Sequence, residues 1–102
     1  MATKKLQILG KISKPAARIA YVDLLATEWT GDGPYMQEII IEGITEYSQV
    51  DLTPSIDQLK TFYDKDLGFV TENENGRVFV YAIGQKPQND YTIQVTITEV
   101  EV

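Results

Sequence analysis

The chain has 102 residues, of which 43% are hydrophobic and 24% are charged, and these values are ordinary for a single globular domain. It contains no cysteine and no histidine, which excludes a disulfide framework, a thiolate nucleophile, and the commonest metal ligand and general base. No run approaches the ~18 apolar residues of a membrane span, and the first residues lack a secretory apolar region. We therefore expect synthesis in a cytoplasm without export by a signal peptide, and no membrane partner.

The formal net charge of −6 conceals an uneven distribution along the chain. Residues 1–18 hold five basic residues and no acid, whereas residues 19–102 hold four basic residues and all fifteen acids, so the net charges are +5 and −11. We expect a basic N-terminal attachment arm over residues 1–18 and a folded domain over residues 19–102. The acidic domain should repel nucleic acid, and the arm should be attracted to an acidic surface. A solvated terminus without a partner is the alternative.

The predicted arm combines positive charge with apolar side chains. Its apolar segment, residues 6–9, ends at Gly10, and Pro15 marks a boundary because it biases the preceding residue toward extended geometry. The segment is too short to fold alone, so we expect it to add to a neighbouring chain or to lie on its own domain. The candidate residues for binding a capsid protein or another partner are Lys4, Lys5, Leu6, Ile8, Leu9, Lys11 and Ile12.

Residues 16–28 fit both a helical and a strand pattern, and we favour a strand because the neighbouring segments are β-like. Residues 29–52 are predicted as a β-turn-β unit. The turn is Gly31-Asp32-Gly33-Pro34, since glycine tolerates positive φ and proline fixes φ. A strand over residues 36–42 should be buried on both faces at its centre, because three isoleucines run consecutively. A turn at Gly43 or at residues 46–47 then leads to a short extended segment over residues 48–52.

One helix is predicted, over residues 53–67. Either Thr53 or Ser55 can cap it: Pro54 would occupy the first turn after Thr53, and Gln58 would complete a capping box with Ser55. Gly68 should supply the C-terminal stop. The residues expected to form one apolar face at helical spacing are Ile56, Leu59, Phe62, Tyr63 and Leu67.

A hairpin is predicted over residues 69–83. A type I turn with Gly76 in the left-handed bulge position is favoured over a two-residue type I′ turn at Asn75-Gly76. The choice matters because a slip of one residue moves every side chain to the opposite face. The favoured turn puts Phe69, Thr71, Phe79, Tyr81 and Ile83 on one face and Val70, Val78, Val80 and Ala82 on the other. One helix cannot cover both apolar faces, so we expect a homotrimer.

Residues 84–90 are expected to form a loop, and residues 91–99 show the clearest strand alternation in the chain. Its inward residues should be Tyr91, Ile93, Val95 and Ile97. Val100 and Val102 break this phase, which predicts a bulge or a departure from the sheet. The sum is a mainly β (α+β) fold: a small antiparallel β-sandwich of five or six strands with one inserted helix at about 53–67.

No segment of the chain meets the residue spacing that a catalytic, metal-binding or cofactor-binding motif requires. Residues 64–68 resemble a calcium loop, but Gly68 falls at a ligand position and Phe69 where the glycine belongs. Gly31 and Gly33 form half of a dinucleotide motif and are followed by a proline, so they indicate a turn. Hydroxyl nucleophiles lack a histidine partner. We therefore predict no enzyme activity.

Aromatic residues near the glycine-rich turn allow two interpretations. They can stack on sugars or bind a partner, or they can plug the end of the core. We expect Trp29 to be a core residue. Tyr35 and Tyr47 remain candidate surface-binding residues.

The chain also resembles a small domain of tailed-phage virion proteins, similar to the C-terminal domain of phage head-fibre-like proteins. The resemblance covers about residues 27–100. It is carried by Trp29-Thr30-Gly31, Gly33-Pro34-Tyr35-x-Gln37, Ile41-x-Gly43-Ile44, Val50-Asp51-Leu52-x-Pro54, Glu72-Asn73-x-Asn75-Gly76, Tyr81-Ala82-Ile83-Gly84-x-Lys86-Pro87 and residues 93–100. The first ten residues also resemble the start of such proteins. Only about sixteen residues separate this start from the domain, which favours a compact decoration protein over a fibre.

The resemblance implies a non-enzymatic capsid decoration or head-fibre-like protein on the virion head surface. Its partners would be other copies of itself, as a trimer, and the major capsid protein or a neighbouring virion protein. An alternative is a tail, baseplate or host-surface carbohydrate-binding module that uses Tyr35 and Tyr47. A weaker alternative is a regulatory protein directed at the host.

Overall fold

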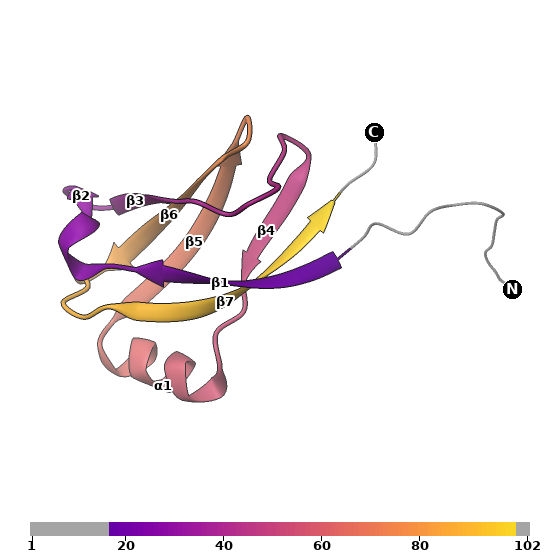
Figure 1. Cartoon of the computed structure of the whole chain (residues 1–102). Coiled ribbons are helices and arrows are strands. Elements are labelled where there is room, and N and C mark those ends of the chain that lie inside the picture. Colours follow the sequence, from indigo (N-terminus) through magenta and orange to yellow (C-terminus); the bar gives the residue numbers. More distant parts are fainter. Residues whose placement is uncertain (1–16, 100–102) are drawn as a thin grey trace, which may run out of the picture.

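The computed structural model describes residues 17–99, which fold into two antiparallel sheets and one α-helix (Figure 1). One sheet has the strand order β1-β7-β4, and the other has the order β2-β3-β6-β5. This confirms the predicted mainly β sandwich with an inserted helix. The described residues form seven strands rather than five or six, because a two-residue strand, β2 (Thr30–Gly31), pairs with β3 (Tyr35–Ile39).

Strand β7 (Tyr91–Glu99) is the centre of the first sheet. It pairs with β1 (Ala17–Leu24) from Tyr91 to Thr98 and with β4 (Ser48–Leu52) from Val95 to Glu99. The predicted strands over the first part of residues 16–28 and over residues 48–52 are therefore confirmed. Ile93, Val95 and Ile97 have no solvent exposure, as the alternation of this strand predicts. A 3-10 turn (Ala26–Glu28) follows β1. Val100 and Val102, with the predicted break in phase, lie outside the described residues.

The glycine-rich turn joins β2 to β3 as predicted, and its Gly33–Pro34 peptide bond is cis. Strand β3 ends earlier than residue 42. Ile39 is buried, but Ile40 is 85% exposed, so the expectation of a strand buried on both faces at its centre is wrong. Ile39 is the last residue of β3 that pairs with β6, and the chain then leaves the sheet through turns at residues 42–43 and 46–47.

The hairpin of β5 (Leu67–Glu74) and β6 (Arg77–Gly84) has a two-residue turn. Asn75 (φ 58°) and Gly76 (φ 93°) both have positive φ, which defines the type I′ turn and not the favoured type I turn with a bulge. The predicted faces are therefore wrong by one residue on β6. The inner face of β6 carries the buried residues Val78, Val80 and Ala82, and the outer face carries Phe79, Tyr81 and Ile83.

Helix α1 (Ile56–Asp64) is shorter than the predicted 53–67. Ser55 caps it through the capping box with Gln58, one of the two predicted arrangements. Thr53 instead donates its main-chain N–H to Gln94 O at 2.8 Å and extends the β4 edge. Gly68 does not stop the helix, because it belongs to β5 opposite Ile83. The chain turns at Asp66, whose φ is 56°.

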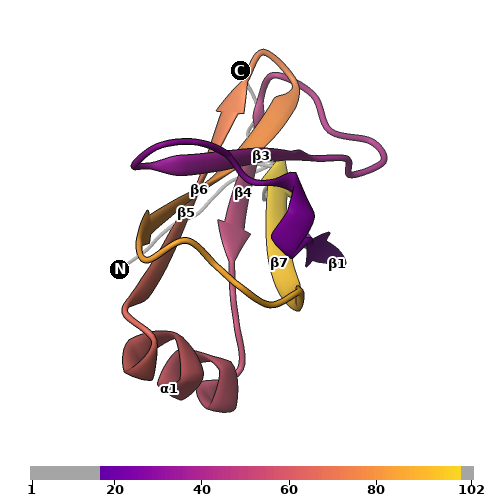
Figure 2. The same cartoon turned by 90° about the vertical axis from the view of Figure 1, so that its left-hand side faces the viewer.

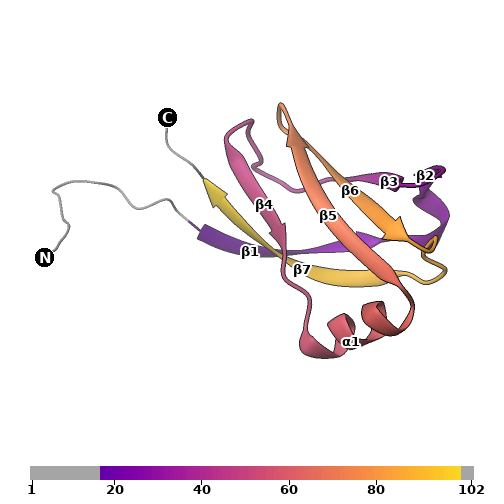
Figure 3. The same ribbon diagram turned by 180° about the vertical axis from the view of Figure 1, so that it is seen from behind.

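Side chains of β5 join the two sheets where β5 passes β4. Asn73 Nδ2 donates to Thr45 O at 2.9 Å and to Ser48 O at 2.8 Å, and the Thr71 hydroxyl donates to Val50 O. Asn73 Oδ1 also accepts the N–H of Gly76 at 2.8 Å, so the same side chain holds the turn. Seen from behind, β4 and β5 lie side by side, and α1 lies below the two sheets (Figure 3).

Candidate binding surfaces

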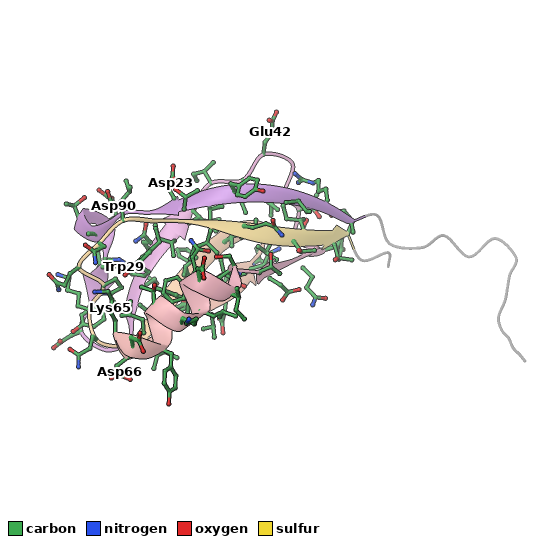
Figure 4. The ribbon with its side chains drawn as sticks, turned by 90° about the horizontal axis from the view of Figure 1, so that it is seen from below. Asp23, Trp29, Glu42, Lys65, Asp66 and Asp90 are labelled. Atoms are coloured by element: carbon green, nitrogen blue, oxygen red, sulfur yellow. The ribbon has the colours of Figure 1, made fainter. Side chains whose placement is uncertain are left out.

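The structure tests the predicted arm only at its end. Lys4, Lys5, Leu6, Ile8, Leu9, Lys11 and Ile12 lie outside the described residues. Ala17 and Arg18 are part of β1, so the folded part of the chain begins at least two residues before residue 19. Arg18 donates from its guanidinium to Glu42 O at 2.8 Å. Glu42 lies on the β3–β4 connection, on the side of the molecule away from α1 (Figure 4).

An apolar groove runs between α1 and the open end of the sandwich. We call it the α1 groove. Its volume is about 730 Å³. Figure 2 shows α1 standing below the strands, joined to them by the chain segments at its two ends. The groove is lined by Leu52, Pro54, Ile56, Leu59, Lys60, Phe62, Tyr63, Asp64, Leu67, Gly68, Phe69 and Ile93.

The α1 groove exists because the body covers only part of the apolar face of α1. Phe62 is 5% exposed and packs into the core. Ile56, Leu59 and Tyr63, which were predicted to share its face, are 73%, 49% and 86% exposed. Ile56, Leu59 and Tyr63 recur at i, i+3 and i+7 and so form one stripe along the helix. Four of the five residues predicted for the apolar face are therefore on α1, and all four line the open groove. The fifth, Leu67, is not on the helix because it belongs to β5.

Two contacts fix the position of α1 against the sandwich. Phe62 packs edge-on against both Phe69 and Tyr91, each with its ring centroid 5.0 Å away. Gln58, the capping-box residue, donates from Nε2 to Thr92 O at 2.7 Å and so ties the first turn to β7. Trp29 stacks on Phe69 at 5.8 Å and is 6% exposed, which confirms that it is a core residue.

Tyr35 lines a polar hollow at the end of the sandwich where Lys65 and Asp66 follow the helix (Figure 4). The hollow has a volume of about 380 Å³. Its other lining residues are Lys65, Leu67, Gln85, Lys86, Gln88 and Asn89. An aromatic ring beside amide and ammonium donors is a combination that can bind a polar ligand such as a sugar.

Tyr47 is exposed and lies far from Tyr35. It lines a different hollow with Thr71 and Asn73, near the far end of β5, whereas Tyr35 lies near Leu67 at the beginning of that strand. The eight residues of β5 span about 25 Å. The two tyrosines therefore do not form one binding surface.

The outer face of the second sheet carries both apolar and charged side chains. Arg77 Nη2 lies 2.9 Å from Glu38 Oε1, and its guanidinium lies over the ring of Phe79 at 5.2 Å. The hydrogen bonds from Arg77 lower the pKa of the Glu38 carboxyl below its usual value. Burial, followed by the nearby carboxylates of Glu74 and Glu72, raises the pKa of the Tyr81 hydroxyl. Val70 and Ile83, on the same face, are exposed.

Within residues 17–99, no three His, Cys, Asp or Glu side chains gather closely enough to hold a metal ion. In that same part of the chain, no helix has the length and apolar character needed to cross a membrane. No family model, curated protein or solved structure matches the chain. The resemblance to phage virion domains is therefore still a prediction.

The sequence predicts the helical residues that line the α1 groove, but it does not predict the groove. The helical spacing of residues 56, 59, 62 and 63 was correctly identified as an apolar face. Helical spacing in the sequence gives no information on the distance between the helix and the sheets. The connection between β4 and the helix is short, because β4 ends at Leu52 and the helix begins at Ile56. A connection of this length starts the helix at the edge of the sandwich and not over its centre.

Proposed function

We propose that this chain is a non-enzymatic structural protein of a tailed-phage virion, a capsid decoration or head-fibre-like protein held on the head surface by its N-terminal arm. The observation that carries the proposal is the division of charge: residues 1–16, which precede β1, carry +4, and residues 17–102 carry −10. An arm of this charge is drawn to an acidic protein surface, while the rest of the chain is repelled by it. Attachment through the arm then leaves the folded domain projecting from the particle.

Apolar residues in the arm support the same proposal. Three of the arm's aliphatic residues, Leu6, Ile8 and Leu9, lie between Lys5 and Lys11, and Ile12 follows Lys11. Charge alone gives an attachment that salt weakens, because exposed charges farther apart than a Debye length of about 8–10 Å are largely screened. Burial of aliphatic side chains adds a contribution that salt does not screen, at roughly 25 cal/mol per Å² of apolar area. The pattern therefore suits stable docking better than a solvated tail.

Self-association as a homotrimer is part of the proposal. Its support is the outer face of the β5–β6 hairpin, where Val70 and Ile83 are exposed beside partly buried Phe79 and Tyr81. Exposed apolar groups gathered on one face mark interaction surfaces in soluble proteins. We expect sedimentation velocity to give a trimer at high micromolar concentration. A monodisperse monomer there would remove the trimer from the proposal.

The proposal is tested by finding the protein on purified particles of the phage whose genome encodes it. We expect mass spectrometry of washed particles to detect the chain in many copies, and antibody labelling in electron micrographs to mark the head. Its absence from washed particles, with the chain present in the infected-cell lysate, would contradict the virion assignment. Label confined to the tail would move the chain to the baseplate alternative.

A second candidate function is carbohydrate binding on a host surface. The observation that favours it is the hollow in which Tyr35 lies beside Lys65, Lys86 and Asn89. Tyr47 lies elsewhere and takes no part in this site. Glycan-array binding that is lost in Tyr35→Ala and retained in Tyr47→Ala would support this function. Binding to no glycan would leave the decoration protein as the proposal.

A further inference from the structure

We propose that the hollow lined by Tyr35, Lys65 and Lys86 binds an acidic sugar, that is, a sugar unit whose ring carries a carboxylate or a phosphate. We call this site the Tyr35 hollow. The inference rests on carbohydrate binding, the second candidate function, and names the class of sugar that the site selects.

The first argument is the sign of the charge in the Tyr35 hollow. Residues 17–102 hold five basic and fifteen acidic residues, so this part of the chain has a net charge of −10. Two of the five basic residues, Lys65 and Lys86, line this one hollow, and no acidic residue lines it. The α1 groove and the hollow at Tyr47 are each lined by at least one carboxylate. Of these three sites, the Tyr35 hollow is therefore the one that attracts an anion locally.

The second argument is that both lysines lack an acidic partner in the described part of the chain. Within residues 17–99 the one salt bridge lies on the outer face of the second sheet, so no carboxylate in contact neutralises Lys65 or Lys86. Asp64 and Asp66 flank Lys65 in the sequence, but neither lines the hollow. An anionic ligand would supply the charge-assisted hydrogen bonds that these ammonium groups do not make with described residues.

The third argument is that the main chain connects the two lysines. The N–H of Gln85 donates to Asp66 O at 3.0 Å, so the residue after Lys65 is joined to the residue before Lys86. On the other side of Lys86, the Pro87 side chain is fully buried. The two segments are therefore held together without a ligand, which reduces the conformational entropy that is lost when a ligand binds.

The fourth argument is that the other lining residues suit a sugar ring better than a bare anion. Tyr35 is half-buried and packs against the core, so its ring offers an apolar surface at the wall of the hollow. The side-chain amides of Gln85, Gln88 and Asn89 can both donate to and accept from sugar hydroxyls. The volume of about 380 Å³ lies at the lower end of the ~300–1,000 Å³ of small-molecule sites and so fits a short saccharide.

The Tyr35 hollow therefore has two parts with separate roles. The Tyr35 ring and the amides bind a sugar of suitable size, whereas the ammonium groups of Lys65 and Lys86 bind only a sugar that carries an anion. A neutral sugar leaves both lysines without a partner. We expect an acidic sugar to bind at least about 10-fold more tightly than its neutral analogue, because charge-assisted hydrogen bonds are stronger than neutral ones.

Titration of the isotope-labelled full-length chain, followed by NMR, tests the inference. The probes are methyl β-glucuronide, glucose 6-phosphate, the neutral methyl β-glucoside and inorganic phosphate. We expect the acidic sugars to shift the main-chain amide signals of Lys65, Gln85 and Asn89, with a Kd at least about 10-fold below that of methyl β-glucoside. The acidic sugar that binds more tightly identifies the anion that the site prefers.

The same titrations contain the results that would contradict the inference. Equal Kd values for the acidic and the neutral sugars would overturn it but leave carbohydrate binding in place. Inorganic phosphate bound as tightly as glucose 6-phosphate would also overturn it, because the sugar ring would contribute nothing. The absence of a saturable shift with every probe would overturn both the inference and the carbohydrate function. The virion assignment is judged separately, on purified particles.

Charge variants show whether the two lysines are responsible. In Lys65→Gln and in Lys86→Gln we expect the Kd for methyl β-glucuronide to rise at least about 3-fold, while the Kd for methyl β-glucoside stays unchanged. Lys60→Gln removes the same charge from the α1 groove and is the matched control. An equal rise in Lys60→Gln would show that net charge attracts the anion and not the Tyr35 hollow, and would overturn the inference.

Discussion

The side-chain amide of Gln37 forms two hydrogen bonds with the main chain of Leu25. The N–H of Leu25 donates to Oε1 at 3.3 Å, and Nε2 donates to Leu25 O at 3.1 Å. Gln37 is on β3 and is 6% exposed, while Leu25 follows β1 in the other sheet. One buried side chain therefore joins the two sheets where β1 ends. It supplies the partner of the Leu25 N–H and shares Leu25 O with the N–H of Glu28.

Replacing Gln37 by Leu should destabilise the domain by about 1–3 kcal/mol, because the N–H of Leu25 loses its partner, whereas Leu25 O keeps the N–H of Glu28 at 3.0 Å. For a domain of this size we expect a fall in melting temperature of at least ~4 °C. Gln49→Leu is the matched control, since Gln49 is exposed on β4. If Gln37→Leu and the control have the same melting temperature, the hydrogen bonds between Gln37 and Leu25 contribute nothing to stability.

The type I′ turn makes a prediction that the competing turn does not make. Asn75 and Gly76 both have positive φ, so Gly76→Val and Asn75→Val should each cost about 1–3 kcal/mol. Under a type I turn with a bulge, only position 76 would need positive φ, and Asn75→Val would be nearly neutral. Urea denaturation of the two variants measures the difference. A neutral Asn75→Val would contradict the turn described here.

The Glu38–Arg77 pair predicts a pH-dependent contribution to stability. Because the folded-state pKa of Glu38 is lowered, the stabilisation is present above its unfolded pKa, about 4.3, and is lost as the pH falls through the folded value. Glu38→Gln should therefore melt below the wild type at pH 7. The gap should narrow as the pH falls below the unfolded pKa of the carboxyl. Melting curves at pH 7, 5 and 3 measure it, and a gap that stays constant over this range would contradict the pairing.

The elements that sequence predicted well are those whose signals are local. Strand β7 alternates regularly, and each of Ile93, Val95 and Ile97 is buried. The capping box of Ser55 and Gln58 depends on two residues three positions apart, and both of its hydrogen bonds form. Alternation and capping depend on neighbouring residues only, so no knowledge of the tertiary structure is needed.

The predictions that failed depend on tertiary structure. Asn75 tolerates either sign of φ, so the sequence left the hairpin turn open, and the pairing of Leu67 with Gly84 decided the faces of β6. That pairing also brings Leu67 and Gly68 into β5 and ends the helix at Asp64. Ile40 follows the same pattern: its β-branched neighbours favour a strand, but the partner strand β6 ends its pairing at Ile39.

Binding surfaces were the least predictable features. Tyr35 and Tyr47 were chosen for their residue type, and the fold separates them along β5. The α1 groove results from the position of the helix relative to the sheets, and no sequence motif encodes it. The charge division between residues 1–18 and the rest of the chain is the one functional signal that the sequence contains directly, because net charge needs no fold to be counted.

Attachment by the arm is tested most directly by co-sedimentation of the chain with purified phage particles at low and at high salt. We predict that removal of residues 1–14 leaves the domain folded and abolishes attachment. Lys4→Glu, Lys5→Glu and Lys11→Glu together should weaken attachment more at low salt than at high salt, since salt already screens the native attraction. Full binding of the shortened chain would contradict the account, and loss of folding would show that these residues belong to the domain.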